Sequence, residues 1–299
     1  MQAIIETLEQ SGLRVLRDEP LALHTSFRVG GPVQAMVFPE SEEQLIQAIT
    51  LLQTADITPL LIGNGSNILA NDAPIARIAI KTQDGVSRLE RLDENTIYAS
   101  AGTRLARLAT FARDEALTGL EFAHGIPGTL GGAVFMNAGA YGGEMAGVVR
   151  RVHYLDSNLT RQVAEHDTCA FAYRHSRFMD TKELILGADL TLTSDDPNEI
   201  GARMTELAEK RRTSQPLDLP SGGSTFKRPK TGYAAAMIDQ AGLKGYTVGG
   251  AQVSEKHAGF VVNRGNATCA DVLAVMAHVQ EVVFAQTGVH LEPEVEFVT

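Results

Sequence analysis

The residues best suited to chemistry gather in two glycine-rich segments and one basic region of this 299-residue chain. The first segment, GNGSN (63–67), directly follows the apolar run TPLLI. After a strand, backbone N–H groups can converge on a phosphate, and glycine lets the phosphate come close. Ser66 and Asn67 would add side-chain donors. A tight turn between strands is the alternative, because the third glycine of a G-x-G-x-x-G fingerprint is missing.

The second segment, GIPGTLGGAVFMNAGAYGG (125–143), has no charged residue. It is too rich in glycine to predict a helix and too apolar to predict an exposed linker. Its glycine pairs at 131–132 and 142–143 indicate positive φ angles or the close approach of another group. Together the two segments predict a large cofactor that carries a diphosphate. A close-packed turn between subdomains remains the alternative.

The basic region runs from Arg203 to Arg264 and holds ten Lys and Arg against five Asp and Glu, in a chain with a net charge of −10. A local excess of positive charge predicts an anion site. Lys227, Lys244 and Lys256 are favoured for it, because they lie beside glycines or outside predicted helices. Arg203 is interpreted as a residue of a solvated helix face.

Composition limits the classes of protein that this chain can be. A net charge of −10 argues against nucleic acid or an anionic membrane as partner. Cys169 and Cys269 have no metal-ligand spacing, which argues against a structural zinc or a disulfide framework and fits a reducing cytoplasm. We find no signal-peptide pattern and no apolar run near the ~20 residues of a membrane span. These features predict a cytoplasmic protein without membrane insertion.

Helical and extended patterns alternate along the chain, so the fold class is α+β or α/β. Capping patterns predict helix starts at Ser41 (with Gln44), Thr103, Asp196 (with Pro197) and Thr268 (with Asp271), and a helix end at Gly288. A further short helix is predicted at the N-terminus. Extended runs are predicted in the segments TPLLIG, ARIAIKT, TIYASAG, RRVHYLD, LILGADLTL, TVGGAQV, AGFVVN and EPEVEFVT. A domain boundary is expected near Thr193.

An ordered set of longer motifs resembles one known family closely. The set comprises TSFRVGGP (25–32), GNGSN (63–67), GLEFAHGIPGTLGGAVFMNAGAYGG (119–143), FAYRHSRF (171–178), QPLDLPSGGSTFKRP (215–229), AGLKG (241–245), GAQVSEKHAGFVVNRGNAT (250–268) and LEPEVEF (291–297). The chain is similar to the UDP-N-acetylenolpyruvoylglucosamine reductases of peptidoglycan synthesis, from Thr25 to Phe297. The motifs are highly specific because of their length and their order.

The resemblance implies an α+β fold with FAD bound in the vanillyl-alcohol-oxidase (PCMH-type) architecture. The implied division is an FAD-binding subdomain at 1–70, a second at 71–193 and a C-terminal substrate-binding domain at 194–299. NADPH would reduce the flavin, which would reduce the enolpyruvyl ether of UDP-N-acetylglucosamine enolpyruvate to the lactyl ether of UDP-N-acetylmuramate. No nucleic acid is implied as partner, and a monomer is expected.

The resemblance also implies which residues hold the cofactor. The two glycine-rich segments would cradle the diphosphate and ribityl chain of FAD. The implied residues are Gly63, Asn64, Gly65, Ser66, Asn67, Gly125, Ile126, Pro127, Gly128, Gly131, Gly132, Ala133, Asn137, Ala138 and Gly139.

Three catalytic residues are implied in the same way. Hydride addition to C3 of the enolpyruvyl group requires a proton donor for C2, and Ser224 matches that donor, with Lys227 as a nearby positive charge. Arg174 matches an arginine whose planar fork suits a carboxylate that gains charge. Glu294 matches a glutamate expected to work with a shared or bound proton. The alternatives are a turn serine, a surface pair between Arg174 and Asp180, and a charge at a strand end.

Substrate contacts are implied for Tyr141, Lys227, Lys244, Gln252, Lys256 and His257. His257 is equally open to a structural role. Longer members of the family commonly read FKNP where this chain has FKRP (226–229), so Arg228 replaces an asparagine. The chain is also compact after FAYRHSRF. Both features resemble a shorter subclass without a tyrosine loop.

Two other functions remain open from the sequence. Another FAD-dependent oxidoreductase on the same scaffold, such as an oxidase, often tethers FAD through His or Cys, and His124 would be the histidine available near the second segment. A non-catalytic nucleotide-sugar-binding protein would explain the glycine segments and the basic region. It would not explain the need for Arg174, Ser224 and Glu294 together.

Overall fold

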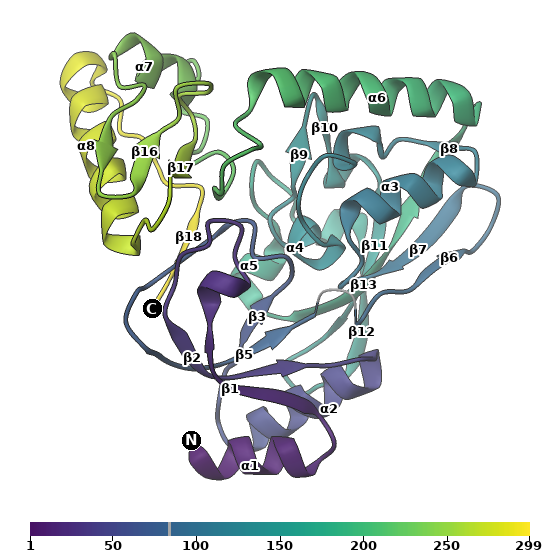
Figure 1. Cartoon of the computed structure of the whole chain (residues 1–299). Helices are drawn as coiled ribbons and strands as arrows, with labels where there is room; N and C mark the ends of the chain where they lie inside the picture. Colours follow the sequence, from purple (N-terminus) through teal and green to yellow (C-terminus); the bar gives the residue numbers. More distant parts are fainter. Residues whose placement is uncertain (83–84) are drawn as a thin grey trace. The chain divides into compact units, whose positions relative to one another are not determined.

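The computed structural model describes residues 1–82 and 85–299, and its helices and strands are mixed throughout (Figure 1), which confirms the predicted α+β class. The helices are α1 (Gln2–Gln10), α2 (Glu42–Thr54), α3 (Leu105–Asp114), α4 (Leu130–Phe135), α5 (Arg177–Thr181), α6 (Pro197–Ser214), α7 (Ala234–Gln240) and α8 (Cys269–Thr287).

The first two-thirds of the chain contain most of the strands that have three or more residues. They are β1 (Arg14–Pro20), β2 (Pro32–Phe38), β3 (Leu60–Ile62), β4 (Ile68–Ala70), β5 (Ile75–Lys81), β6 (Leu89–Arg91), β7 (Thr96–Ser100), β11 (Val149–Leu155), β12 (Arg161–Glu165) and β13 (Leu184–Thr191). The remaining strands are β8 (Leu117–Thr118), β9 (Gly139–Ala140), β10 (Gly143–Glu144), β14 (Thr193–Ser194), β15 (Thr247–Val248), β16 (Ala251–Val253), β17 (Val261–Asn263) and β18 (Glu296–Val298).

The chain forms two compact units, each built from separate stretches of sequence. Unit 1 comprises residues 1–16, 35–64 and 78–210, and unit 2 comprises 17–34, 65–77 and 211–299. The division implied by the resemblance, at 70 and 193, cuts the chain into continuous segments instead. Compactness places residues 17–34 and 65–77 with the C-terminal segment, and it places most of α6 in unit 1.

Unit 1 contains a five-stranded antiparallel sheet in the order β12-β11-β13-β7-β6. The helices α3 and α4 pack their apolar residues against it, with Leu108 of α3 and Leu130 of α4 fully buried beside Ile97 and Leu190. The amides of Leu130 and Gly131 donate to the carbonyls of Thr103 and Ala101, both at 2.8 Å. These bonds join the start of α4 to the loop after β7, and α4 lies near β13 and β7 in Figure 1.

A second sheet, in the order β1-β2-β5-β3, lies near the N-terminus. Its β3 and β5 are parallel, with Leu61 paired to Ile80. In unit 1 the apolar faces of α1 and α2, including Leu8 and Leu45, share a core with Ile80. The strand β3 ends at Ile62, so the GNGSN segment follows a strand as predicted.

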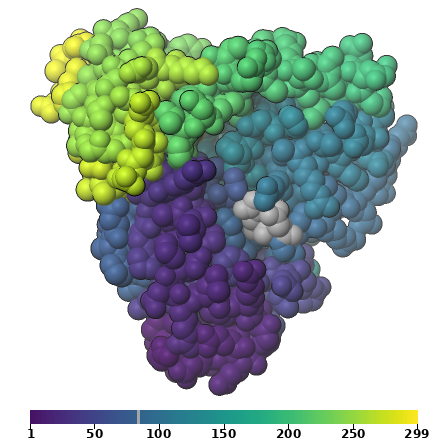
Figure 2. Space-filling model, in the orientation of Figure 1, coloured from purple at the N-terminus to yellow at the C-terminus, as the bar shows by residue number. Residues whose placement is uncertain are grey.

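Unit 2 contains the three-stranded antiparallel sheet β15-β16-β17 and the parallel pair of β18 with β4. The C-terminal residues gather in one region of the surface in Figure 2, coloured yellow-green to yellow. By length and composition alone α8 could span a membrane, contrary to the sequence expectation. Val272, Val275 and Val279 of α8 are nevertheless fully buried in the core of unit 2, as in a core helix of a globular protein.

Most of the predicted helix ends are confirmed. Ser41 caps α2 and its hydroxyl accepts a 3.2 Å hydrogen bond from the amide of Gln44. Thr268 and Asp271 form a complete capping box at the start of α8. Gly288 ends α8 with a φ of 70°.

Two local predictions are wrong. The predicted N-cap Thr103 is fully buried and does not cap a helix. Arg104 occupies the N-cap of α3, one residue after the predicted position. The glycine-rich segment does contain a helix, the short α4 with the sequence LGGAVF. Glycine lowers helix propensity, but here Leu130, Ala133 and Val134 are buried in the core of unit 1, and that packing overrides propensity.

Candidate cofactor and substrate site

The two glycine-rich segments meet within unit 1. The Nδ2 of Asn64 donates a 2.6 Å hydrogen bond to the carbonyl of Pro127. A Cβ atom added to Gly63 would collide with the Oγ1 of Thr129, so only glycine fits there without a shift. The two segments predicted to share a cofactor are therefore in contact at Asn64 and Gly63, and the cofactor contacts themselves stay a prediction.

The glycines of the two pairs, 131–132 and 142–143, differ in why the structure requires glycine. A Cβ atom at Gly131 would stand 2.9 Å from the Cβ of Ala101, and one at Gly143 would stand 2.5 Å from the ring of Phe122. Gly142 has a φ of 87° and forms with Tyr141 the two-residue turn between β9 and β10. Neither constraint applies at Gly132, because a Cβ atom there would meet only the Oγ1 of Thr129, at 3.9 Å.

The rest of GNGSN belongs to unit 2, where it contacts the C-terminal segment. The Nδ2 of Asn67 donates to the carbonyl of Glu294 at 3.0 Å, and the amide of Glu296 donates to the carbonyl of Asn67 at 2.7 Å. Gly65 has a φ of 66°, and an added Cβ atom there would collide with the carbonyl oxygen of His24. Asn67 is thus fixed beside the predicted catalytic glutamate by two hydrogen bonds.

The segments of Ser224 and Glu294 lie side by side in unit 2. The amide of Glu294 donates to the carbonyl of Thr225 at 2.8 Å, and Phe226 forms an antiparallel bridge with Pro293. Thr225 is fully buried, and its Oγ1 accepts a 2.9 Å bond from the amide of Val261. Ser224 itself is exposed, and its hydroxyl makes no hydrogen bond within residues 1–82 and 85–299.

The loop before Ser224 is supported by Ser26 and Phe27, two residues to which the sequence analysis gave no role. Ser26 donates from its hydroxyl to the carbonyl of Ser221 at 2.6 Å. A Cβ atom at Gly222 would collide with the ring of Phe27, which is fully buried. The motif TSFRVGGP was part of the resemblance and could have signalled this role, although no function was assigned to it.

Arg174 lies at the tip of a tight turn in unit 1. Ala172 and His175 exchange backbone hydrogen bonds of 3.0 and 3.1 Å across the turn, and Arg174 has a φ of 53°. Its Nη2 donates to the carbonyl of Gly139 at 3.3 Å, and its guanidinium lies 5.2 Å from the ring of Tyr173. Asp180, the partner suggested for Arg174 in the alternative reading, pairs with His175 at 3.0 Å.

Three of the residues implied to bind the cofactor have almost no accessible surface. Asn137 is 0% exposed, Ala133 3% and Ala138 6%. Both polar atoms of the Asn137 side chain bind backbone groups, because Oδ1 accepts from Ala146 and Nδ2 donates to Ala172, each at 2.9 Å. The buried side chain of Asn137 therefore supports two loops, and its contact with the cofactor stays a prediction.

The basic residues of the second half have protein partners. Lys227 pairs with Glu292. Lys244 pairs with Asp239 at 2.8 Å. The Nζ of Lys256 donates to the carbonyl of Arg212 at 2.6 Å. The guanidinium of Arg228 stacks over the ring of Tyr233 at 4.2 Å.

Arg203 does not simply decorate a solvated helix face, contrary to the sequence interpretation. Its guanidinium binds Asp195 at 2.5 Å and Glu121 at 3.0 Å, and it donates to the Oγ1 of Thr118 at 3.1 Å. The hydrogen bond from Arg203 is the main reason that the pKa of Asp195 is lowered. Arg203 thus fastens α6 to the loop after β8 in unit 1.

Gln252 and His257 are held by the C-terminal sheet region. The Nε2 of Gln252 donates to the Oγ1 of Thr247 at 2.9 Å. The amide of Gly259 donates to the Nδ1 of His257 at 3.2 Å, and burial lowers the pKa of His257. The neutral imidazole is therefore favoured, which supports the structural role left open for His257.

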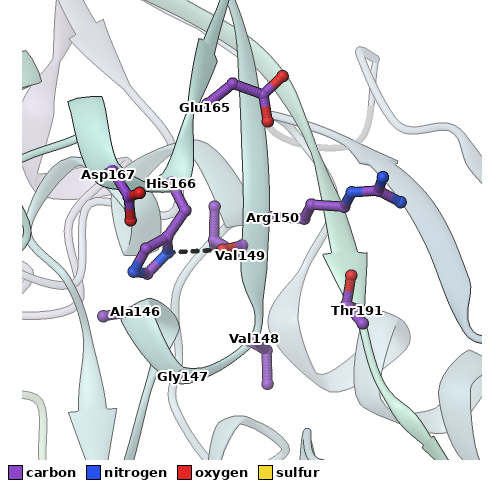
Figure 3. A pocket seen from close by; sticks show the side chains of 9 residues that line it. All are labelled: Ala146, Gly147, Val148, Val149, Arg150, Glu165, His166, Asp167 and Thr191. Carbon is purple, nitrogen blue, oxygen red and sulfur yellow. Dashed lines mark hydrogen bonds between the residues drawn. The ribbon is translucent and has the colours of Figure 1, made fainter.

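A hollow in unit 1 of about 500 Å³ contains none of the implied site residues (Figure 3). Its ionisable lining residues are Arg150, Glu165, His166 and Asp167, all of which are exposed. The Nδ1 of His166 donates to the carbonyl of Val149 at 2.9 Å, because a carbonyl can only accept. No buried polar group faces this hollow among its lining residues, and we assign it no role.

Comparison with known proteins first defines the class. Residues 33–158 match the model of an FAD binding domain. The fold of alkyldihydroxyacetonephosphate synthase is similar, with a TM-score of 0.50 and 14% identity over 65% of this chain and 40% of that one. The chain therefore has the FAD-binding fold of the vanillyl-alcohol-oxidase type, as predicted.

The family follows from closer relatives. Residues 215–298 match the C-terminal domain of UDP-N-acetylenolpyruvoylglucosamine reductase. The reductase of Caldanaerobacter subterraneus subsp. tengcongensis is 44% identical over 94% of this chain and 92% of its own length. The crystal structure of the Thermus caldophilus reductase has a TM-score of 0.81 and 33% identity, covering 96% of this chain and 100% of that one. The chain belongs to the UDP-N-acetylenolpyruvoylglucosamine reductase family.

The residues of the glycine-rich segments fit the cofactor that this family implies. The segment from Gly125 to Gly143 has no charged side chain that would repel a diphosphate. The space beside Gly132 on α4 is open, and a larger side chain would fill it. Asn64 and Gly63 hold the first segment against this stretch. Uncharged, bare backbone of this kind suits a diphosphate that must come close to the main chain.

Proposed function

We propose that this protein catalyses the FAD-dependent, NADPH-driven reduction of UDP-N-acetylglucosamine enolpyruvate to UDP-N-acetylmuramate in peptidoglycan synthesis. The observation that carries the proposal is 44% identity over 94% of the chain to a relative named for the reductase. The exposed hydroxyl of Ser224 beside the Glu294 segment is consistent with it. We also propose that the enzyme is cytoplasmic and monomeric.

The cofactor contacts are proposed for the two glycine-rich segments. Gly63, Asn64 and the stretch from Gly125 to Gly132 would hold the FAD diphosphate through bare backbone, with Ser66 and Asn67 as further donors. When bound and reduced by NADPH, FAD would supply the hydride for C3 of the enolpyruvyl group. The protein must supply everything else, namely orientation, a proton and stabilisation of charge.

Ser224 is proposed as the proton donor to C2. A serine hydroxyl is a weak acid, so its proton must be given to a carbon that has become strongly basic. The neighbouring Thr225 supports this role. It is buried and makes three hydrogen bonds, with Gly259, Val261 and Glu294, which hold the backbone beside Ser224 in place. Lys227 is proposed as the assisting charge, a role for which it would have to share its pairing with Glu292.

Arg174 and Glu294 are proposed to stabilise the negative charge that develops at C2 and at the substrate carboxylate. The guanidinium of Arg174 can donate two parallel hydrogen bonds to a carboxylate. Glu294 would act in protonated form, because an ionised carboxylate would repel the same charge. The backbone of Glu294 is fixed on both sides, by Thr225 and by Asn67, so its side chain starts from a defined position.

Substrate contacts beyond the reacting group are proposed for Tyr141, Lys244, Gln252 and Lys256, which could reach the UDP or its phosphates. Lys244 and Lys256 already have protein partners. Binding a diphosphate would require these lysines to share or exchange partners, which lowers the net gain from each contact.

Product analysis tests the proposal directly. The purified protein, loaded with FAD, is incubated with NADPH and UDP-N-acetylglucosamine enolpyruvate, and the nucleotide sugar is analysed by mass spectrometry. The product should gain two hydrogen atoms, one of them from the nicotinamide when labelled NADPH is used. An unchanged nucleotide sugar in the presence of bound, reducible FAD would point to another flavin oxidoreductase and would contradict the proposal.

A further inference from the structure

The side chain of Asn137 joins two segments that are distant in sequence. It has no accessible surface, its Oδ1 accepts from the amide of Ala146 and its Nδ2 donates to the carbonyl of Ala172, each at 2.9 Å. Asn137 also follows α4 with a φ of 46°, a conformation that asparagine tolerates better than most residues. One residue therefore ends α4 and holds the segment that follows it.

Ala172 is the first residue of the turn that presents Arg174. The turn is fastened at its other end by Ser176, which is fully buried and donates from its hydroxyl to the carbonyl of Phe135 at 2.6 Å. Its tip is fastened by the 3.3 Å bond from Arg174 to the carbonyl of Gly139. All three bonds involve residues 135–139, at the C-terminal end of α4 and just after it.

We propose that Asn137 is a positioning residue for Arg174, an inference that rests on the proposed function of Arg174. Its Nδ2–H holds the carbonyl of Ala172, and this bond keeps the turn closed with Arg174 in its left-handed conformation. A positive φ at a non-glycine residue is strained and persists only where the surroundings enforce it. Loss of the donor would let Arg174 relax and would aim its guanidinium elsewhere.

The variant Asn137→Asp tests the hydrogen bond that Asn137 donates separately from the one that it accepts. An ionised carboxylate keeps the shape and can still accept from Ala146, but it cannot donate to the carbonyl of Ala172. Burial raises the pKa of such a carboxyl, and its protonated form can donate again. Asn137→Gly removes both bonds, keeps the backbone conformation available and has no proton to regain.

Stopped-flow absorbance of the FAD-loaded variants measures the two half-reactions. For Asn137→Asp near pH 8, we expect flavin reoxidation by UDP-N-acetylglucosamine enolpyruvate to slow by about tenfold or more, with flavin reduction by NADPH within about twofold of wild type. The defect relative to wild type should shrink as the pH is lowered. For Asn137→Gly the defect should be the same at every pH. A purely structural role would not give this contrast.

Limited trypsin digestion of the cofactor-free proteins gives a readout that does not depend on activity. Trypsin cleaves after arginine in a loosened segment. The fragment that ends at Arg174 should appear faster from Asn137→Gly and from Ser176→Ala than from wild type. Ile97→Val, a buried change on β7 in the same core that removes no hydrogen bond of the turn, serves as control for general destabilisation and should leave this rate unchanged.

The outcomes separate this inference from the proposed function. If wild type converts the substrate and both Asn137 variants match it in flavin reoxidation and in cleavage after Arg174, the positioning role is overturned. Equal losses in Ile97→Val, or equal losses in both half-reactions, would overturn it as well. Should wild type itself fail to reoxidise its flavin with this substrate, the proposed function fails, and cleavage after Arg174 still tests the hold on the turn.

Discussion

The backbone amide of Glu294 donates a 2.8 Å hydrogen bond to the carbonyl of Thr225, the residue that follows Ser224. This bond, the bridge between Phe226 and Pro293 and the bond from the amide of Lys227 to the carbonyl of Glu292 form a short antiparallel ladder. Two segments about 70 residues apart in the sequence are thereby held in one register, as cross-strand pairing requires. The proposed proton donor and the proposed glutamate therefore belong to one rigid element of unit 2.

Removal of the Ser224 hydroxyl should separate the two half-reactions. In Ser224→Ala, NADPH should still reduce the bound flavin at nearly the wild-type rate, and reoxidation by substrate should slow by about a hundredfold or more, because the proton donor is lost. Rapid-mixing absorbance measures both rates. Ser157→Ala, which removes an exposed serine hydroxyl in the turn between β11 and β12, is the control. An equal loss in both half-reactions would reject Ser224 as the donor.

A change of Arg174 that keeps its charge should still impair turnover. Arg174→Lys replaces a planar fork with a point charge, and we expect kcat to fall by about tenfold or more. Steady-state kinetics with saturating NADPH provides the measurement. Arg161→Lys, at an exposed arginine paired with Glu42, should behave as wild type. Turnover close to wild type in Arg174→Lys would show that charge alone suffices.

Adjacent glycines of α4 should respond in opposite ways to alanine. Gly131→Ala places a Cβ atom 2.9 Å from the Cβ of Ala101 and should lower the stability of the cofactor-free protein by about 1–3 kcal/mol. Gly132→Ala has room and should gain up to about 1 kcal/mol from helix propensity. Thermal unfolding measures both changes.

The same pair tests the proposed cradle. If the open side of Gly132 receives FAD, Gly132→Ala should release flavin at lower denaturant than wild type, although its cofactor-free form is more stable. Flavin fluorescence during mild denaturation reports this release. Unchanged flavin retention in Gly132→Ala would place the cofactor away from this helix.

His257 should make stability depend on pH. Burial lowers its pKa from the ordinary value of about 6.5, so the folded state favours the neutral ring. Its contribution is present above that value and is lost as the pH falls, because the unfolded state then binds the proton more tightly. The Tm of wild type should therefore fall more between about pH 7.5 and 5 than that of His257→Gln. The control His290→Gln, at an exposed histidine, should follow wild type.

Local signals predicted three helix ends correctly and failed at Thr103, where the N-cap is Arg104. The capping residues Ser41 and Thr268 and the stop at Gly288 depend on backbone groups within a few residues, and all three are confirmed. The sequence assigned GNGSN and the second glycine-rich segment to one cofactor, but it did not predict the hydrogen bond from Asn64 to Pro127. The motif order identified the family correctly.

Features that depend on distant contacts could not be predicted. The burial of Leu130 and Val134 stabilises α4 against its glycines, and no local pattern shows that core. Asn137 was placed with the cofactor because it lies in the right motif, while its hydrogen-bond partners, Ala146 and Ala172, are fixed by tertiary structure. The pairing of Lys227 with Glu292 likewise requires the register of two segments that are distant in sequence.

The visible absorption of the purified protein, followed without oxygen through one complete cycle, tests the central claim most directly. The account predicts a yellow protein whose visible flavin absorption bleaches with NADPH and returns on addition of UDP-N-acetylglucosamine enolpyruvate, mole for mole. A colourless protein that cannot be loaded with FAD, or a bleached flavin that this substrate does not reoxidise, would contradict it.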